Sequence, residues 1–342
     1  MIETVKKPYS YSFENFAKQD QNILCLSGDL TSSCEVDGFR DRYPNQFLSM
    51  GMAEQNMMSF AGGLGLAGFR PFVHTFAVFA YRRPYDQLLA SIAYPRRKVR
   101  IMGFLPGITT PAGMTHQAIE DIAIMRTIPN MTVLETGDAT EVESICNVAD
   151  SIDGPVYCRI LRGNVPRLFS TPMKIGEIRV LNEGTDLLVV TSGISTEESL
   201  RARTAIKNIG ISIQHIHLHT IKPINKALLL SHIEKVKYGV ITMENHLING
   251  GTGSLIADII AENGIAKKLI KLGLNDTFAH GGSKAYLLKY YQLDAYALVK
   301  SIEKLMNLKT GINEDNLDKV RVEDVHSLAK EEALYFYERK FF

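Results

Sequence analysis

Short apolar runs alternate with longer amphipathic stretches along most of the chain. Apolar runs at 22–29, 71–76 and 98–104 predict buried strands, and helical periodicity at 52–68 and 117–128 predicts helices. A further helix is expected at 138–150, with Asp138 as its N-cap and Glu141 at capping-box spacing. Regular alternation of strand and helix indicates an α/β fold with a mostly parallel sheet covered by helices.

The alternation stops and then restarts, which predicts two domains. Residues 162–186 are rich in proline, glycine and charge, and the segments after them again alternate apolar runs with helical patterns. We expect a second α/β unit, also built on a mostly parallel sheet, and a helical tail with exposed aromatic residues. The predicted division is 1–165 for the first domain, 166–182 for the linker, 183–305 for the second domain and 306–342 for the tail.

Composition narrows the class of protein. The 342 residues are 45% hydrophobic, and 38 basic against 37 acidic residues leave a net charge of +1, too little to recruit nucleic acid or an anionic membrane. Four cysteines without a C-x-x-C pair indicate neither a disulfide framework nor a zinc ribbon. The first residues lack an apolar signal core, and no run approaches the roughly 18 apolar residues of a membrane helix. We expect a soluble cytoplasmic protein that acts on a small molecule.

Glu54 is the first candidate for chemistry. It lies where a predicted loop meets the helix at 52–68, a place where the helix dipole ordinarily favours an acid. The alternative is a carboxylate held in a poorly solvated crevice for proton transfer. Glycines at 62, 63, 65 and 68 predict close backbone packing, as at a subunit interface. Phe76 and Phe79 follow, and their rings would offer flat surfaces to a heterocycle.

Four segments carry a family resemblance. GMAEQNM (51–57), TFAVFA (75–80) and the block from GMTHQ to GDATE (113–141) resemble the pyrimidine-binding domain of the transketolase family of thiamine-diphosphate enzymes. MENHLINGGTGSLIADIIAENG (243–264) is similar to the C-terminal transketolase domain. The resemblance covers about residues 10–305. It implies transfer of a two-carbon ketol unit from a ketose donor to an aldose acceptor.

One transketolase motif is missing from this chain. Full transketolases begin with a domain marked by Gly-Asp-Gly and a later Asn, whereas here Gly28-Asp29 precedes Leu30 and Gly137-Asp138 precedes Ala139. The resemblance therefore implies the C-terminal subunit of a split enzyme. A separate N-terminal subunit, in an α2β2 heterotetramer, would supply the diphosphate site and the Mg²⁺ ligands, with no metal ligand from this chain.

The resemblance also assigns roles at the cofactor. Glu54 matches the glutamate that hydrogen-bonds N1′ of the thiamine-diphosphate aminopyrimidine, Phe79 the ring stacked on it and Phe76 its companion. Asp29 matches an aspartate near the thiazolium. His116 matches a histidine at the reacting centre, where neutral imidazole can pass a proton or bind a substrate hydroxyl. Without the resemblance, His116 is equally a helix cap.

Substrate-binding residues follow in the same way. Ser33 and Arg162 match residues that bind a sugar phosphate, although arginine joins domains by salt bridges equally often. Ala112 stands where transketolases usually have an acid, and Phe104 falls near the place of a histidine. At Tyr9 and Ser10, where another phosphate contact would lie, the chain has no basic residue. We therefore expect a non-standard acceptor sugar.

Other interpretations remain open. His215, His217 and His219 alternate and could chelate a metal from one strand face, but the apolar residues between them already explain the strand. His246 is interpreted as structural or interfacial. A second enzyme hypothesis is the β subunit of a 2-oxoacid dehydrogenase E1 component, which the Thr-His-Gln block disfavours. A third is a non-catalytic scaffolding or regulatory partner, which the joint presence of Glu54, Phe79 and His116 disfavours.

Overall fold

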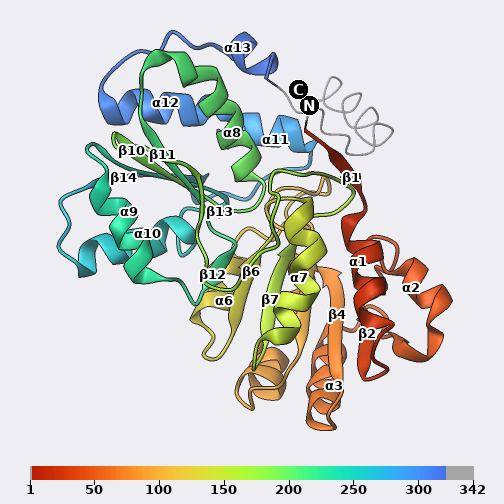
Figure 1. Cartoon of the computed structure of the whole chain (residues 1–342). Helices are drawn as coiled ribbons and strands as arrows, with labels where there is room; N and C mark the ends of the chain where they lie inside the picture. The colour runs from red at the N-terminus through yellow and green to blue at the C-terminus, as the bar shows by residue number, and fades with distance from the viewer. Residues whose placement is uncertain (1, 321–342) are drawn as a thin grey trace.

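The first unit is built on a seven-stranded sheet. The computed structural model describes residues 2–320, and its first sheet has the order β12-β6-β7-β5-β4-β2-β3 (Figure 1). All neighbouring strands are parallel except β12, which runs antiparallel to β6. The strands are β2 (Ile23–Ser27), β3 (Phe47–Ser49), β4 (Arg70–Phe76), β5 (Arg100–Phe104), β6 (Thr132–Glu135), β7 (Val156–Ile160) and β12 (Thr220–Lys222).

Helices cover this sheet, as the alternating pattern predicts. Every residue of β2, β5 and β7 is buried, which explains why these strands read as nearly continuous apolar runs. On α1, the Phe13 ring packs 5.6 Å from Phe72 of β4. The helices are α1 (Pro8–Ala17), α2 (Asp37–Arg42), η1 (Pro44–Gln46), α3 (Glu54–Leu66), α4 (Ala77–Tyr81), α5 (Tyr85–Gln87), the π-helix η2 (Leu88–Ala93), α6 (Asp121–Thr127) and α7 (Ala139–Ser151).

The second unit has a five-stranded sheet of order β14-β13-β10-β11-β9, parallel except for β9. In Figure 1, α8 and α12 lie on one side of this sheet and α9 and α10 on the other. Its strands are β9 (Arg179–Asn182), β10 (Leu187–Thr191), β11 (Ile213–His217), β13 (Gly239–Leu247) and β14 (Lys268–Leu274). Its helices are α8 (Ser195–Ile206), η3 (Lys207–Ile209), α9 (Lys226–Lys235), α10 (Thr252–Glu262), α11 (Lys284–Tyr290), α12 (Ala295–Met306) and α13 (Glu314–Asp318). The predicted fold class, α/β with mostly parallel sheets, is confirmed.

The two units are joined by more than the connecting segment. β1 (Thr4–Lys6) pairs with β8 (Asn164–Pro166) at the end of the first unit, and β12, which follows β11 in the chain, extends the first sheet. Asp138 caps α7 as predicted, accepting a bond from the Glu141 amide at 2.8 Å. The Glu141 carboxylate accepts from the Gly137 amide and from residues of the second unit. Glu141 therefore links α7 to the second unit.

Local differences from the sequence pattern have physical reasons. The helix expected at 117–128 begins only at Asp121. At Gly62, an added Cβ would lie 2.4 Å from the Ser91 carbonyl oxygen, so the close packing predicted for this glycine is made within the chain. Gly63 faces open space. Of the predicted tail, residues 321–342 lie outside the described part of the chain.

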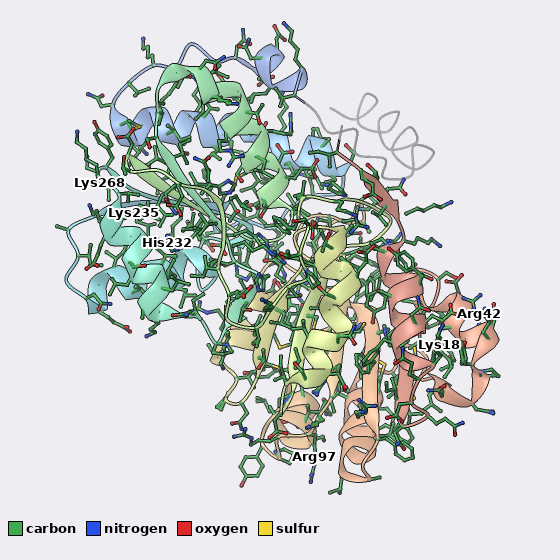
Figure 2. All side chains as sticks on the ribbon, in the orientation of Figure 1. Lys18, Arg42, Arg97, His232, Lys235 and Lys268 are labelled. Atoms are coloured by element: carbon green, nitrogen blue, oxygen red, sulfur yellow. The ribbon has the colours of Figure 1, made fainter. Side chains whose placement is uncertain are left out.

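Charged side chains are spread over both units (Figure 2). Lys18 and Arg42 are labelled beside α1 and α2, whereas His232, Lys235 and Lys268 lie at the opposite end of the molecule. The basic residues labelled there therefore do not gather on one face. Among residues 2–320, no helix is long and apolar enough to cross a membrane.

Candidate active site

The candidate residues follow the carboxyl ends of neighbouring parallel strands. These strands are β3, β2, β4, β5 and β7, which are consecutive neighbours in the first sheet. Parallel strands end at one edge of a sheet, and ligands of open α/β sheets bind in the crevice there. In the order of the strands just given, the candidates at or after their ends are Glu54, Asp29 and Ser33, Phe76 and Phe79, His116, and Arg162.

Glu54 and Phe79 enclose one cationic group. Glu54 opens α3 with a side chain only 3% exposed, and Arg83 Nη1 donates to its Oε1 at 2.6 Å. The same Arg83 guanidinium lies over the Phe79 ring, with its Cζ 4.0 Å from the ring centroid. Phe76 and Phe79 are stacked, with centroids 6.1 Å apart and planes 17° apart. A buried carboxylate and an aromatic face thus hold a flat nitrogen donor between them.

His116 completes this cluster. Its ring lies edge-on to Phe79, with centroids 5.3 Å apart, and 6.3 Å from Phe76. Its Nδ1 is 2.9 Å from Thr115 Oγ1, so the hydroxyl restricts the orientation of the imidazole. The imidazole is half-buried and reaches the same two aromatic rings as the cluster around Glu54. The structure therefore brings Glu54, Phe76, Phe79 and His116 together.

Arg82 fixes the turn that carries His116. Its guanidinium donates to Glu120 at 2.5 and 2.7 Å and to the carbonyls of Met114 and Gln117 at 3.0 and 3.2 Å. Burial opposes the charge on Glu120, but the hydrogen bonds from Arg82 leave the pKa of its carboxyl below the ordinary value. The sequence interpretation missed Arg82. The sequence feature that could have drawn attention to Arg82 is the Arg82-Arg83 pair, which follows a largely apolar stretch.

The second unit holds the loop between β5 and α6. Asn245 Nδ2 donates to the Pro106 carbonyl at 3.0 Å, and its Oδ1 accepts from the Ile108 amide at 3.0 Å. Gly107 between them has φ 63°, and a Cβ there would lie 2.2 Å from the Asn245 side chain. Further along the loop, Gln117 Nε2 donates to the His280 carbonyl at 3.2 Å. Residues of the second unit therefore position the loop that ends in His116.

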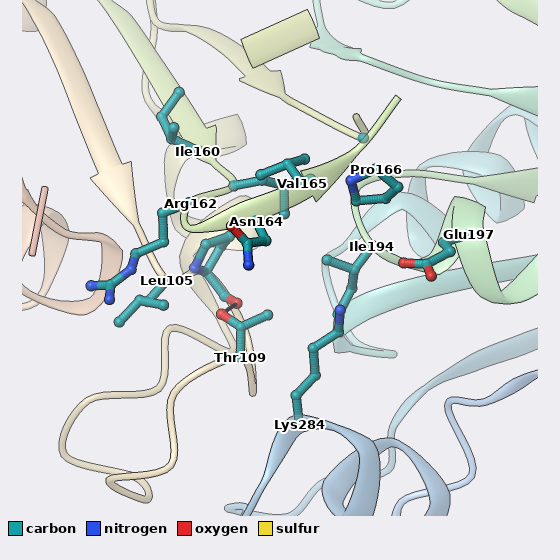
Figure 3. A pocket seen from close by; sticks show the side chains of 13 residues that line it. Leu105, Thr109, Ile160, Arg162, Asn164, Val165, Pro166, Ile194, Glu197 and Lys284 are labelled. Atoms are coloured by element: carbon teal, nitrogen blue, oxygen red, sulfur yellow. Dashed lines mark hydrogen bonds between the residues drawn. The ribbon is translucent and has the colours of Figure 1, made fainter. Parts of the chain in front are cut away.

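Arg162 and Ser33 meet, but through the backbone. Arg162 Nη1 donates to the Ser33 carbonyl oxygen at 2.8 Å. Arg162 also lines a pocket between the two units, where Lys284 stands on the opposite side and Asn164 lies between them (Figure 3). Asp29 is exposed at the same sheet edge, with φ 64°, a conformation that Asp tolerates better than most residues. The pocket with Arg162 lies beside, and not within, the ring cluster.

Phe104 is not part of the cleft. It is fully buried on β5, where the Tyr9 ring meets it edge-on with centroids 5.0 Å apart. Phe104 falls near the place of a family histidine in the sequence, but its side chain at the end of β5 points into the core and adds no surface to the acceptor loop. Tyr9 is also buried, with its hydroxyl 2.7 Å from His74 Nε2. Ala112 is exposed on the loop.

Two of the three alternating histidines converge on Glu141. His217 Nε2 is 3.0 Å and His219 Nδ1 is 3.4 Å from the Glu141 carboxylate, whereas His215 bonds Ser199 instead. Arg179 Nε also donates to Glu141 Oε1 at 2.7 Å. Burial opposes the charge, but these basic neighbours bring the pKa of Glu141 down to about 2. Because Arg179, His217 and His219 already pair with the Glu141 carboxylate, the group fits an ion-pair cluster between the units better than a metal site.

His246 lies on β13 at the contact between the units. Its Nε2 accepts from the Ala123 amide at 3.3 Å. Nearby, Glu244 caps α10, accepting from the amides of Thr252 and Gly253 at 2.6 and 2.9 Å. An added Cβ on Gly251 would lie 2.1 Å from the Glu244 carboxylate. The glycines at the start of α10 therefore accommodate an internal carboxylate.

Comparisons with known proteins agree with this arrangement of two α/β units. The family model "Transketolase, pyrimidine binding domain" matches residues 4–167, and "Transketolase, C-terminal domain" matches residues 176–298. The chain belongs to the transketolase family.

Some relatives match this chain over nearly their whole length. A "putative transketolase C-terminal section" from Methanocaldococcus jannaschii is 36% identical over 307 residues, covering 88% of this chain and 96% of the relative. A "6-deoxy-6-sulfo-D-fructose transketolase subunit" from Clostridium sp. (strain MSTE9) is 34% identical, covering 86% and 92%. The solved structure of a "split gene transketolase, inactive beta4 tetramer" superposes with a TM-score of 0.79 at 36% identity, covering 88% of this chain and 97% of that one.

Proposed function

We propose that this chain is the C-terminal subunit of a two-chain, thiamine-diphosphate-dependent transketolase. The enzyme would move a two-carbon ketol unit from a ketose donor to an aldose acceptor. The observation that carries the proposal is the pairing of buried Glu54 with the Phe79 face around one planar nitrogen donor. An aminopyrimidine ring is also flat and bonds through ring nitrogens, so the residues fit it.

Each residue of the cluster has a task in this proposal. When bound, thiamine diphosphate supplies the carbon nucleophile that cleaves the ketose. Glu54 would hold a proton at N1′, and burial keeps water from competing for that bond. Phe76 and Phe79 would orient the ring. His116 would accept a proton from, or donate one to, a substrate hydroxyl beside them.

Partner dependence rests on what the chain carries and what it exposes. It lacks the Gly-Asp-Gly motif of the diphosphate-binding domain. Met52, Phe60 and Leu66, in and beside α3, are exposed, and Tyr94 after η2 is 87% exposed. Large apolar side chains exposed in this way are typical of subunit interfaces. The partner would contribute the diphosphate and Mg²⁺ ligands, and the inactive β4 tetramer of the related structure is consistent with that division.

The acceptor is proposed to differ from ribose 5-phosphate. Ala112 is exposed on the loop and offers no carboxylate to an acceptor hydroxyl. A site that hydrogen-bonds a hydroxyl can discriminate by about 10⁴, and an apolar replacement discriminates far less. The name of the Clostridium relative, which refers to a sulfonated deoxy sugar, supports a modified substrate. Arg162 would hold an anionic end group.

The test combines this chain with the product of the adjacent reading frame. Ketol transfer is measured over phosphorylated and unphosphorylated sugars, with each chain alone as control. We expect activity only with both chains, loss of cofactor C2 hydrogen exchange in Glu54→Gln, and altered acceptor preference in Ala112→Asp.

The competing functions predict other results. Decarboxylation of a 2-oxo acid without ketol transfer would favour the dehydrogenase β subunit, and unchanged C2 exchange in Glu54→Gln would favour the non-catalytic partner. Micromolar binding of thiamine diphosphate by this chain alone would contradict the split-enzyme proposal.

A further inference from the structure

The Arg83 side chain lies where the proposed function places a cofactor ring. Its guanidinium is bonded to Glu54 Oε1 at 2.6 Å, and its Cζ stands 4.0 Å from the Phe79 ring centroid. Those are the two groups proposed to bond and stack an aminopyrimidine. One planar group cannot share both of them with another, so arginine and cofactor ring compete for the same space.

We infer that Arg83 is a displaceable plug, which closes the pyrimidine site in the free chain and leaves it when the ring of thiamine diphosphate enters. The inference rests on the proposed function, because it takes Glu54 and Phe79 as the pyrimidine site. It adds a residue with an opposing role: Arg83 lowers the apparent affinity of the site for the ring.

Arg83 has few contacts that would prevent its side chain from moving. It is 48% exposed, and within residues 2–320 its guanidinium bonds Glu54 on one side and lies against the Phe79 face on the other. Its neighbour Arg82 makes the opposite case, with bonds to Glu120 and to two backbone carbonyls. Arg82 is thus held in place, whereas Arg83 can rotate toward solvent without breaking a backbone contact of its guanidinium.

Arg83 has a physical role at Glu54 before the ring binds. Glu54 is 3% exposed, and Arg83 is the cation paired with it. Arg83 neutralises it and covers Phe79 until another flat donor arrives. Because binding then requires the open state, the apparent dissociation constant rises in inverse proportion to the open fraction.

Calorimetry with thiamine diphosphate and Mg²⁺ tests the inference on the reconstituted pair and on this chain alone. If the plugged state outweighs the open one by about ten to one, Arg83→Ala tightens binding about tenfold. The matched control is Arg42→Ala. Arg42 is similarly exposed, at 56%, and is also paired with a glutamate, Glu14, at the α1–α2 edge labelled in Figure 2. We expect Arg42→Ala to bind like the wild type.

The direction of the effect makes the test discriminating. Thiamine diphosphate is anionic, so loss of a positive charge alone would weaken binding. Tighter binding by Arg83→Ala, and by the near-isosteric Arg83→Gln, therefore supports displacement. Equal or weaker binding by both folded variants, with thermal unfolding as the check on folding, overturns the plug.

The two proposals fail in different ways. If the wild-type pair binds thiamine diphosphate and neither Arg83 variant tightens it, the plug is wrong and the proposed function stands. If neither the wild-type pair nor any variant binds thiamine diphosphate, the proposed function is wrong and the plug falls with it.

Discussion

Arg159 and Arg83 are both paired with carboxylates in the first unit, yet their surroundings differ. Arg159 is completely buried, donates to Asp121 at 2.9 Å, pairs with Glu135 and reaches the Asn245 carbonyl of the second unit at 2.9 Å. Arg83 is half-exposed and holds Glu54 by a single bond. Arg159 is enclosed by its partners, whereas Arg83 lies over Glu54 and Phe79 with one side open to solvent.

This difference indicates which charged pair is structural. Removing a buried arginine leaves its carboxylates buried without their cation, so the arrangement around Arg159 is costly to break. Water can replace a half-exposed guanidinium, so the Arg83 pair can open at small cost. Residue type is the same in both places. Exposure and the number of hydrogen bonds separate the structural pair from the displaceable one.

The largest expected effect is on stability when the enclosed pair is broken. Arg159→Ala should lower the free energy of unfolding by about 3–5 kcal/mol, because Asp121 and Glu135 remain buried without their cation. Urea unfolding followed by circular dichroism measures this change, with Arg42→Ala as an exposed control. A loss below about 1 kcal/mol would show that Arg159 is not structural and would remove the contrast with Arg83.

Two buried histidines, His74 and His215, make the stability of the chain depend on pH. Burial lowers the pKa of His74 and of His215 to about 3, whereas an unfolded histidine titrates near pH 6.5. The unfolded chain therefore binds more protons between these values, and stability must fall as pH falls below about 6.5. Each histidine should cost roughly 2 kcal/mol between pH 7 and pH 5.

The measurement is urea unfolding at pH 7, 6 and 5 for the wild type and for His215→Gln. The variant should show a smaller loss of stability on acidification, by about the contribution of one histidine. The same pH dependence in both proteins would mean that His215 is protonated in the folded chain.

The strand ends were predictable from the sequence, and with them most of the candidate site. Each candidate follows an apolar run, and the rule that parallel strands end together places Glu54, Phe79 and His116 at one edge. The burial of Phe104 could not be predicted in this way, because successive side chains of a strand point to opposite faces of the sheet.

Contacts between distant residues could not be predicted in this way. Asn245 reaches Pro106 across 139 residues of sequence, and β12 joins a sheet whose other strands lie before residue 161. Local patterns carry no signal for such contacts. Arg83 is a similar case, since its position over Phe79 depends on how α4 and α5 follow β4.

A smaller effect is expected where the second unit holds the loop. Asn245→Ala removes the bonds to the Pro106 carbonyl and the buried Ile108 amide, and unpaired buried groups cost about 1–3 kcal/mol. Urea unfolding gives the loss of stability, and hydrogen exchange at Ile108 should become faster. Unchanged exchange at Ile108 would show that Asn245 does not hold the loop.

The smallest expected effect is on the stability of the chain without Arg83. Arg83→Ala should change the free energy of unfolding by about 1 kcal/mol or less, as for other half-exposed ion pairs. Glu54 loses its partner, but it lies in the first turn of α3, where the helix dipole favours a negative charge. The double variant Arg83→Ala, Glu54→Gln completes a thermodynamic cycle in urea, and its coupling energy should also stay near or below 1 kcal/mol. A loss of 3 kcal/mol or more in Arg83→Ala would place Arg83 in the same class as Arg159, and the contrast between an enclosed and a displaceable arginine would fail.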